Sequence, residues 1–116
     1  MSVFDTNIII DYLQGNVKAA RAISSDPNPA VSIVTWMEVL AGAETDFETM
    51  SAHSVLSAFN LIQLDINIAT SAVEQRKKLR LKLPDAIIYA TALSLGTVVI
   101  TCDKNFPKSR FVRNPY

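Results

Sequence analysis

Short apolar runs rich in β-branched residues alternate along this chain with longer segments whose apolar residues recur at helical spacing. Runs this short, nearly free of charge, are typical of strands that a sheet buries on both faces. Strands are expected at residues 2–5, 30–34, 61–64 and 97–101, and near Phe111 and Val112. Because helical segments separate these strands, the order predicts a three-layer α/β fold: a short, mostly parallel sheet of about five strands with helices on both faces.

The segments between the strands carry helical patterns with recognisable starts and stops. Helices are expected over residues 8–13, 17–23, 35–41, 46–59, 67–81 and 84–95. Gly15 separates the first two, Gly42 and Gly96 follow the third and the last, and Pro84 suits the first turn of the last. Residues 84–95 are apolar nearly all round, which indicates a helix buried in the interior.

The length and composition predict a single domain spanning residues 1–116. Of its residues, 49% are apolar and 19% are charged, and eleven cations balance eleven acids, so no global positive field attracts nucleic acid. The only cysteine, Cys102, excludes an internal disulfide and suits a reducing, cytoplasmic compartment. The only histidine, His53, has no neighbours that suit a zinc site or a catalytic triad. Residues 86–102 are uncharged, but their hydroxyl groups and Gly96 favour a helix and a strand over a membrane span.

Four carboxylates follow expected strands or begin expected helices. They are Asp5 in VFDTNII, Glu38 in IVTWMEVLAG, Asp85 in KLPDAIIYA and Asp103 in VITCDKNF. Right-handed crossovers bring the carboxyl ends of parallel strands to one edge, so these side chains are expected to converge there. Four converging carboxylates repel one another unless a cation lies among them, and Mg²⁺ or Mn²⁺ prefers such oxygen ligands.

Each acid also has a purely structural interpretation. Asp5 suits a helix cap, and Thr35 and Glu38 match the T-x-x-E capping box. Asp85 suits the positive end of a helix dipole, and Asp103 suits a turn closed by its own side chain. Ser, Thr or Asn would serve as well at such positions, so a carboxylate at all four indicates that negative charge is needed.

The cations are unevenly distributed along the chain. Five of the eleven lie within residues 76–82, and four more lie between Lys104 and Arg113. The first run suits a solvated helix end that complements the helix dipole. Arg80 and Lys82 nevertheless stand just before Asp85, where they could contact phosphates of a nucleic acid. Asp65 is interpreted as the cap of the helix that follows it.

Four blocks of sequence together resemble the PIN-domain nucleases, and especially their small VapC-type toxins. The blocks are FDTNIIIDYL, SIVTWMEVLAG, LRLKLPDAIIYATAL and ITCDKNF, and they cover the chain nearly end to end. The resemblance implies that Asp5, Glu38, Asp85 and Asp103 hold Mg²⁺ or Mn²⁺ and catalyse RNA hydrolysis. It also implies a supporting hydroxyl at Thr6, while Asn7 matches a recurrent position.

The same resemblance implies partners and products. An RNA substrate would be cut to 5′-phosphate and 3′-hydroxyl ends, a small antitoxin protein would block the acidic cleft, and the toxin would form a homodimer. Two alternatives remain open. A phospho-receiver-like signalling module also combines a small α/β fold with an acidic Mg²⁺ pocket, and a PIN ribonuclease of RNA processing would need no antitoxin.

Overall fold

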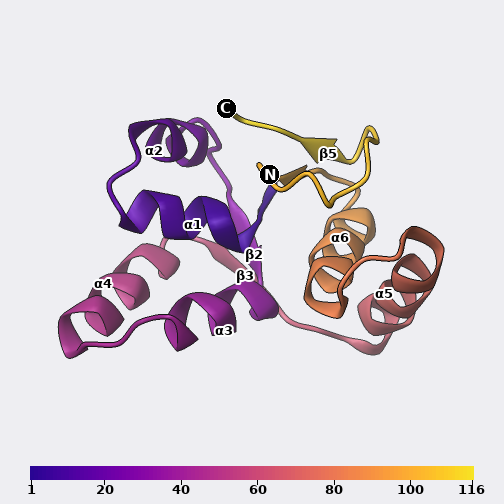
Figure 1. Cartoon of the computed structure of the whole chain (residues 1–116), viewed down its shortest axis with the longest axis horizontal. Coiled ribbons are helices and arrows are strands. Elements are labelled where there is room, and N and C mark those ends of the chain that lie inside the picture. The colour runs from indigo at the N-terminus through magenta and orange to yellow at the C-terminus, as the bar shows by residue number, and fades with distance from the viewer.

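The computed structural model describes residues 1–116 and contains one parallel sheet of five strands (Figure 1). The strands are β1 (Val3–Phe4), β2 (Ala30–Ser32), β3 (Asn60–Ile62), β4 (Val99–Ile100) and β5 (Val112–Arg113). Their order across the sheet is β3-β2-β1-β4-β5, and every neighbouring pair is parallel. The predicted α/β class and the strand count are therefore confirmed.

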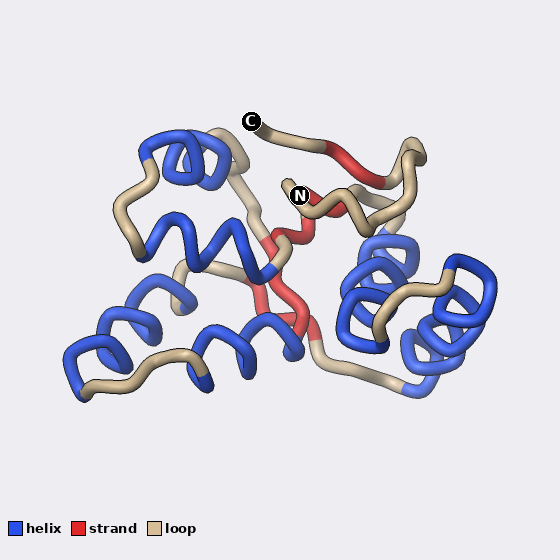
Figure 2. The backbone as a smooth tube through the Cα atoms, in the orientation of Figure 1, coloured by secondary structure: helices blue, strands red, loops and turns tan.

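Six helices surround the strands, which form the thin central layer of Figure 2. They are α1 (Thr6–Leu13), α2 (Val17–Ser24), α3 (Ile33–Ala41), α4 (Asp46–Leu56), α5 (Ile66–Leu79) and α6 (Leu83–Leu95). Helices α5 and α6 lie side by side at one side of the molecule, and α1 to α4 lie at the other. None of these helices is both long and apolar enough to cross a membrane.

Two apolar clusters, one on each face of the sheet, form the core. Successive residues of a strand point to opposite faces, so Val3 packs into the cluster with α5 and α6 while Phe4 packs into the cluster with α1 to α4. Ala30 and Val31 divide between the two clusters in the same way. The three central strands β2, β1 and β4 are therefore buried on both faces, which explains their nearly continuous apolar sequence, whereas the edge strands β3 and β5 are partly exposed.

The sequence prediction was wrong about where β2 ends. The run 30–34 was expected to be extended throughout, yet Ile33 and Val34 already belong to α3. Ser32 adopts an extended backbone, and its hydroxyl oxygen accepts a hydrogen bond from the Val34 amide at 3.1 Å. This cap satisfies an otherwise unpaired amide and starts the helix two residues earlier than the apolar pattern indicated.

The other helix ends lie within three residues of their predicted positions. Asp65 caps α5 as predicted, accepting a hydrogen bond from the Ile68 amide at 2.8 Å. Gly96 ends α6 in the left-handed conformation, with φ of 65°, which a residue without a Cβ adopts at little cost. Helix α4 ends at Leu56, three residues before the predicted boundary.

Candidate functional site

The four predicted acids line one pocket at the carboxyl ends of the strands. The pocket has a volume of about 380 Å³. Its lining consists of Asp5, Thr6, Asn7, Ile10, Glu38, Lys82, Pro84, Asp85 and Asp103. Only one of these nine residues is hydrophobic. The predicted convergence of the acids is thus a property of the structure: the segments that follow β1, β2 and β4 contribute Asp5, Glu38 and Asp103, and the first turn of α6 contributes Asp85.

Asp5 is the most deeply buried of these acids. It follows β1 directly and is 3% exposed. One carboxylate oxygen accepts from the Thr6 amide at 2.8 Å, and the other accepts from the Thr101 hydroxyl at 2.7 Å. Burial, and to a smaller extent the charges of Asp85 and Asp103, raise the pKa of Asp5 to about 6 despite these two hydrogen bonds, which lower it. Asp5 does cap α1, but its surroundings disfavour its negative charge, which a cap does not need.

Glu38 extends from α3 toward α1 rather than back along its own helix. The Thr6 hydroxyl donates a hydrogen bond to Glu38 Oε1 at 2.7 Å and lies 3.0 Å from the hydroxyl of buried Thr35. The structural alternative for Glu38, a capping box with Thr35, is therefore wrong, since Thr35 lies inside α3. The capping box of this protein joins Thr45 and Glu48 at the start of α4.

Asp85 lies in the first turn of α6, as the sequence predicted, and its side chain makes no hydrogen bond within the protein. Burial raises its pKa, and the charges of Asp103 and Glu38 raise it further, whereas Lys82 lowers it. The like charges that act on Asp85 come from two other segments, so the acids influence one another electrostatically as well as sharing a pocket.

Thr101 joins two of the acids and was not singled out from the sequence. Its buried hydroxyl donates to Asp5 and accepts from the Asp103 amide at 2.9 Å. Asp103 also accepts from the Asn105 amide at 2.9 Å, so its predicted turn is present as well. In the sequence Thr101 reads as the last β-branched residue of an apolar strand, and only its place one residue beyond β4 marks it as different.

The donor set suits a hard divalent cation. The four carboxylates and the Thr6 hydroxyl offer oxygen ligands, and a cation would relieve the mutual repulsion of the carboxylates. No group of three His, Cys, Asp or Glu side chains lies close enough together to hold a metal ion. A divalent cation in this pocket would therefore be held by one or two carboxylates and would keep water ligands, as Mg²⁺ does.

The predicted basic residues separate at this site. Lys82 lines the acidic pocket, whereas Arg80 does not and instead ends α5 in the left-handed conformation, with φ of 57°. Asn7 lines the pocket from the first turn of α1. His53 is exposed on α4, where its ring packs against Trp36, and takes no part in the site.

These features define a parallel α/β domain with a carboxylate pocket at the carboxyl edge of its sheet. The chain belongs to the PIN domain family, whose model matches residues 2–112. This confirms the family predicted from the four sequence blocks.

Solved structures support the same assignment. A toxin–antitoxin complex from Klebsiella pneumoniae contains a chain with 40% identity and a TM-score of 0.93, and the match covers 100% of this chain and 98% of that one. FitAcB from Neisseria gonorrhoeae, at 23% identity, has a TM-score of 0.81 and coverage of 99% and 98%. DNA-bound VapBC from Salmonella typhimurium, at 23% identity, has a TM-score of 0.77 and coverage of 97% and 96%. The last two show the shared fold, and the comparison with curated proteins gave no match.

Proposed function

We propose that this protein is a Mg²⁺- or Mn²⁺-dependent endoribonuclease and the toxin of a type II toxin–antitoxin pair. The observation that carries the proposal is the pocket in which Asp5, Glu38, Asp85 and Asp103 meet from four separate segments. Membership of the PIN domain family and the 40% identical chain in a toxin–antitoxin complex support it. Purely structural caps do not need to share a pocket or raise one another's pKa.

Each residue has a defined part in this chemistry. A bound divalent ion would activate water and offset the negative charge of the scissile phosphate. Thr6 and Thr101 fix the orientations of Glu38 and Asp5 through hydrogen bonds to their carboxylates. Asp85, whose oxygens carry no internal hydrogen bond, is free to accept one from water. Lys82 at the rim offers positive charge to the RNA backbone, and we extend this contact to Arg80 just beyond it.

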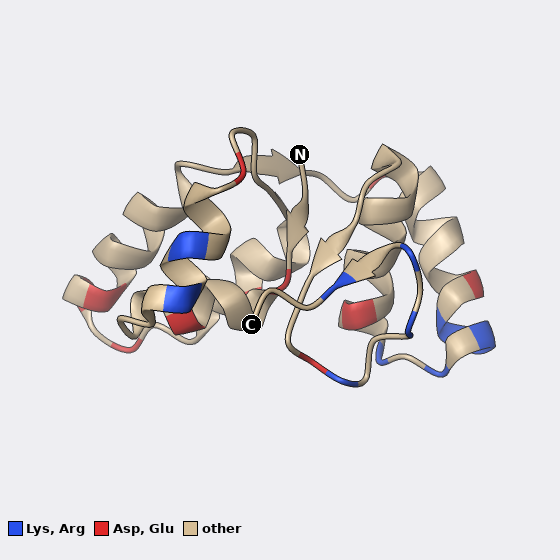
Figure 3. Cartoon of the chain, turned by 90° about the horizontal axis from the view of Figure 1, so that it is seen from above, with Lys and Arg blue, Asp and Glu red and all other residues tan.

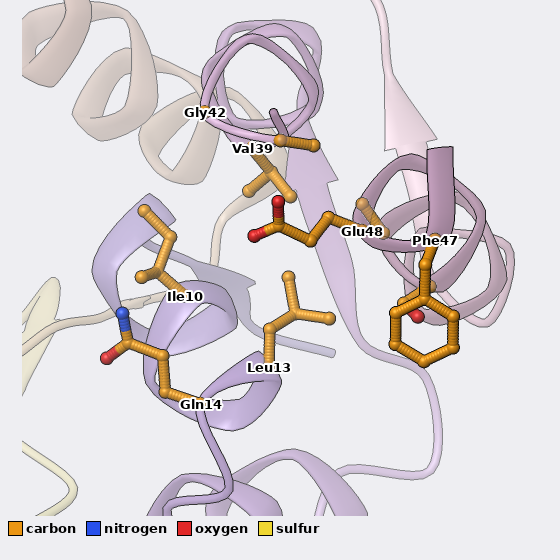
Figure 4. A pocket seen from close by; sticks show the side chains of 10 residues that line it. Ile10, Leu13, Gln14, Val39, Gly42, Phe47 and Glu48 are labelled. Carbon is orange, nitrogen blue, oxygen red and sulfur yellow. The ribbon is translucent and has the colours of Figure 1, made fainter. Parts of the chain in front are cut away.

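A second pocket supports the antitoxin partner. Figure 4 shows it between Ile10 and Leu13 of α1, with Gln14 just beyond that helix, and Phe47 and Glu48 of α4. Phe47 is 78% exposed, so this groove leaves apolar surface uncovered. Ile10 lines both this groove and the acidic pocket. An antitoxin tail with apolar side chains in the groove would therefore continue directly into the cleft and block it.

Purified protein should cut single-stranded RNA in Mg²⁺ or Mn²⁺ and should lose this activity when EDTA removes the metal. The products should carry 5′-phosphate and 3′-hydroxyl ends, which sequencing of RNA ends would detect. Cleavage that continues undiminished after thorough chelation would overturn the proposed mechanism. Labelling of the protein by a small phosphodonor, with no RNA cleavage, would instead favour the receiver module.

The pairing with an antitoxin needs its own test. Co-expression with the small protein encoded beside this one should suppress cleavage, and Phe47→Ser should weaken that suppression without affecting cleavage by the free protein. An active nuclease with no inhibitory neighbour would instead indicate a PIN ribonuclease of RNA processing. We also propose that the free protein forms a homodimer, which its sedimentation would test.

A further inference from the structure

A third pocket lies beside the acidic one, on the connection between β4 and β5. It has a volume of about 550 Å³, and Asp103 lines both pockets, so the two are contiguous. Its other lining residues are Thr101, Cys102, Lys104, Phe106, Pro107, Lys108, Ser109, Val112 and Asn114. We propose that this pocket, the β4–β5 pocket, binds a backbone phosphate of the RNA next to the scissile one. This inference rests on the proposed nuclease function and adds to it.

The charge of this region favours a polyanion. From Lys104 to the carboxyl end the chain carries Lys104, Lys108, Arg110 and Arg113 and no acid. None of the four forms an ion pair, since the one salt bridge of the protein joins the amino terminus to Asp26. Figure 3 shows cations along the connection between β4 and β5 and at the neighbouring end of α5. These cations are thus free to pair with phosphates.

RNA binding needs such local charge because the molecule as a whole carries no net positive charge. The net charge is zero, and the four carboxylates of the cleft repel a phosphodiester chain. Salt screens exposed charges beyond about 10 Å, so only cations that border the cleft can offset this repulsion. Lys82 borders it on the side of α6, while Lys104 and Lys108 line the pocket reached past Asp103. A strand that crosses the carboxylates would meet cations on both sides.

The connection is also held in place, which distinguishes it from a freely moving basic tail. Phe106, between the two lysines, is 5% exposed and packs into the core cluster with α5 and α6. Ser109 lies within hydrogen-bond distance of the Tyr89 hydroxyl on α6, at 3.1 Å. The pocket is therefore formed before RNA binds, so little entropy is lost in ordering it.

The test compares two charge-matched double variants. Lys104→Gln with Lys108→Gln removes the two lysines of the pocket, and Lys18→Gln with Arg21→Gln removes two cations from α2, which lines none of the three pockets. Affinity for a short oligouridine RNA is measured against salt in Ca²⁺, where cleavage should be slow. Each phosphate that is no longer neutralised reduces the slope of log K against log salt by about 0.7, so the first variant should lose about 0.7 for the single phosphate of the pocket and the second variant nothing.

A second measurement places the contact along the RNA. Replacing single phosphates by neutral methylphosphonates should weaken binding to the unaltered protein most beside the scissile position. The same replacement should cost the Lys104 and Lys108 double variant nothing further, because the partners of that phosphate are already gone. This inference alone would be overturned if the Lys104 and Lys108 double variant still bound and cut RNA, kept the salt slope of the unaltered protein, and lost as much affinity as that protein on methylphosphonate replacement. A protein that neither binds nor cuts RNA would overturn the proposed function as well.

Discussion

Asp5→Asn should stabilise the metal-free protein while abolishing its activity, because the carboxylate is held in a setting that disfavours its charge. Its pKa is raised from 3.8 to about 6 in the folded state. A group whose pKa rises on folding stabilises the fold only while protonated, so this contribution is complete below pH 3.8 and is lost as pH rises through 6. The free energy of unfolding should therefore fall between about pH 4 and pH 6.

The size of the effect follows from that shift. One pKa unit corresponds to about 1.4 kcal/mol, so ionised Asp5 lowers the stability at pH 7 by roughly 3 kcal/mol. An amide keeps one oxygen to accept from the Thr6 amide, and its nitrogen can donate to the Thr101 hydroxyl oxygen in place of the present bond. Exchanging that bond costs about 1 kcal/mol. The net gain at pH 7 should be about 2 kcal/mol, or roughly 8 °C in Tm.

Thermal and denaturant unfolding in EDTA, followed from pH 4 to pH 7.5, would measure this gain. Asp46→Asn, an equally conservative change at an exposed position in the first turn of α4, serves as the control and should bring no such gain. The Asp5→Asn protein should also lose most of the decline in stability between pH 4 and pH 6. If it unfolds more easily than the unaltered protein at pH 7, then Asp5 is chiefly a cap, and the argument that burial and repulsion disfavour its charge fails.

Two further changes separate structure from chemistry. Glu38→Gln keeps an oxygen for the Thr6 hydroxyl, so Tm should stay within about 2 °C while the rate of RNA cleavage falls by roughly two orders of magnitude or more. The control Glu74→Gln on α5 should change neither Tm nor the cleavage rate. A fully active Glu38→Gln protein would show that Glu38 has only a structural role. Thr101→Val removes the hydroxyl between Asp5 and Asp103 and should cost about 1–3 kcal/mol of stability. Thr101→Val should also shift the pH dependence of cleavage to higher pH, because Asp5 loses a hydrogen bond that favours its charged form. Thr101→Ser should restore both the stability and the pH dependence. A pH profile of cleavage that Thr101→Val leaves unchanged would limit Thr101 to a packing role.

Local sequence patterns were sufficient for the sheet and for the edge at which the acids meet. Buried parallel strands are continuous apolar runs, and parallel connections of one hand leave few alternatives for where their ends lie. The end of β2 was misplaced because Ile33 and Val34 favour strands by type, while the cap at Ser32 that overrides this preference is a single hydroxyl.

Contacts between distant segments could not be derived in the same way. T-x-x-E at Thr35 and Glu38 matches a local capping motif, but the structure pairs Glu38 with Thr6, 32 residues away. Thr101 bonds to Asp5 across 96 residues, and nothing in the order of residue types indicates that pairing. The two pockets that flank the cleft could not be predicted from the sequence either, because each combines side chains whose spacing depends on how the elements pack.

The central claim is that the four acids form one metal-dependent centre for RNA cleavage. The most direct measurement is the cleavage rate against Mg²⁺ concentration for the unaltered protein, Asp85→Asn and the exposed control Asp46→Asn. Asp85 makes no internal hydrogen bond, so its replacement should leave folding intact. The account predicts a saturable dependence on Mg²⁺ that Asp46→Asn retains, and a rate at least about 100-fold lower for Asp85→Asn at every concentration. A folded Asp85→Asn protein that cuts RNA as fast as the unaltered one would contradict it.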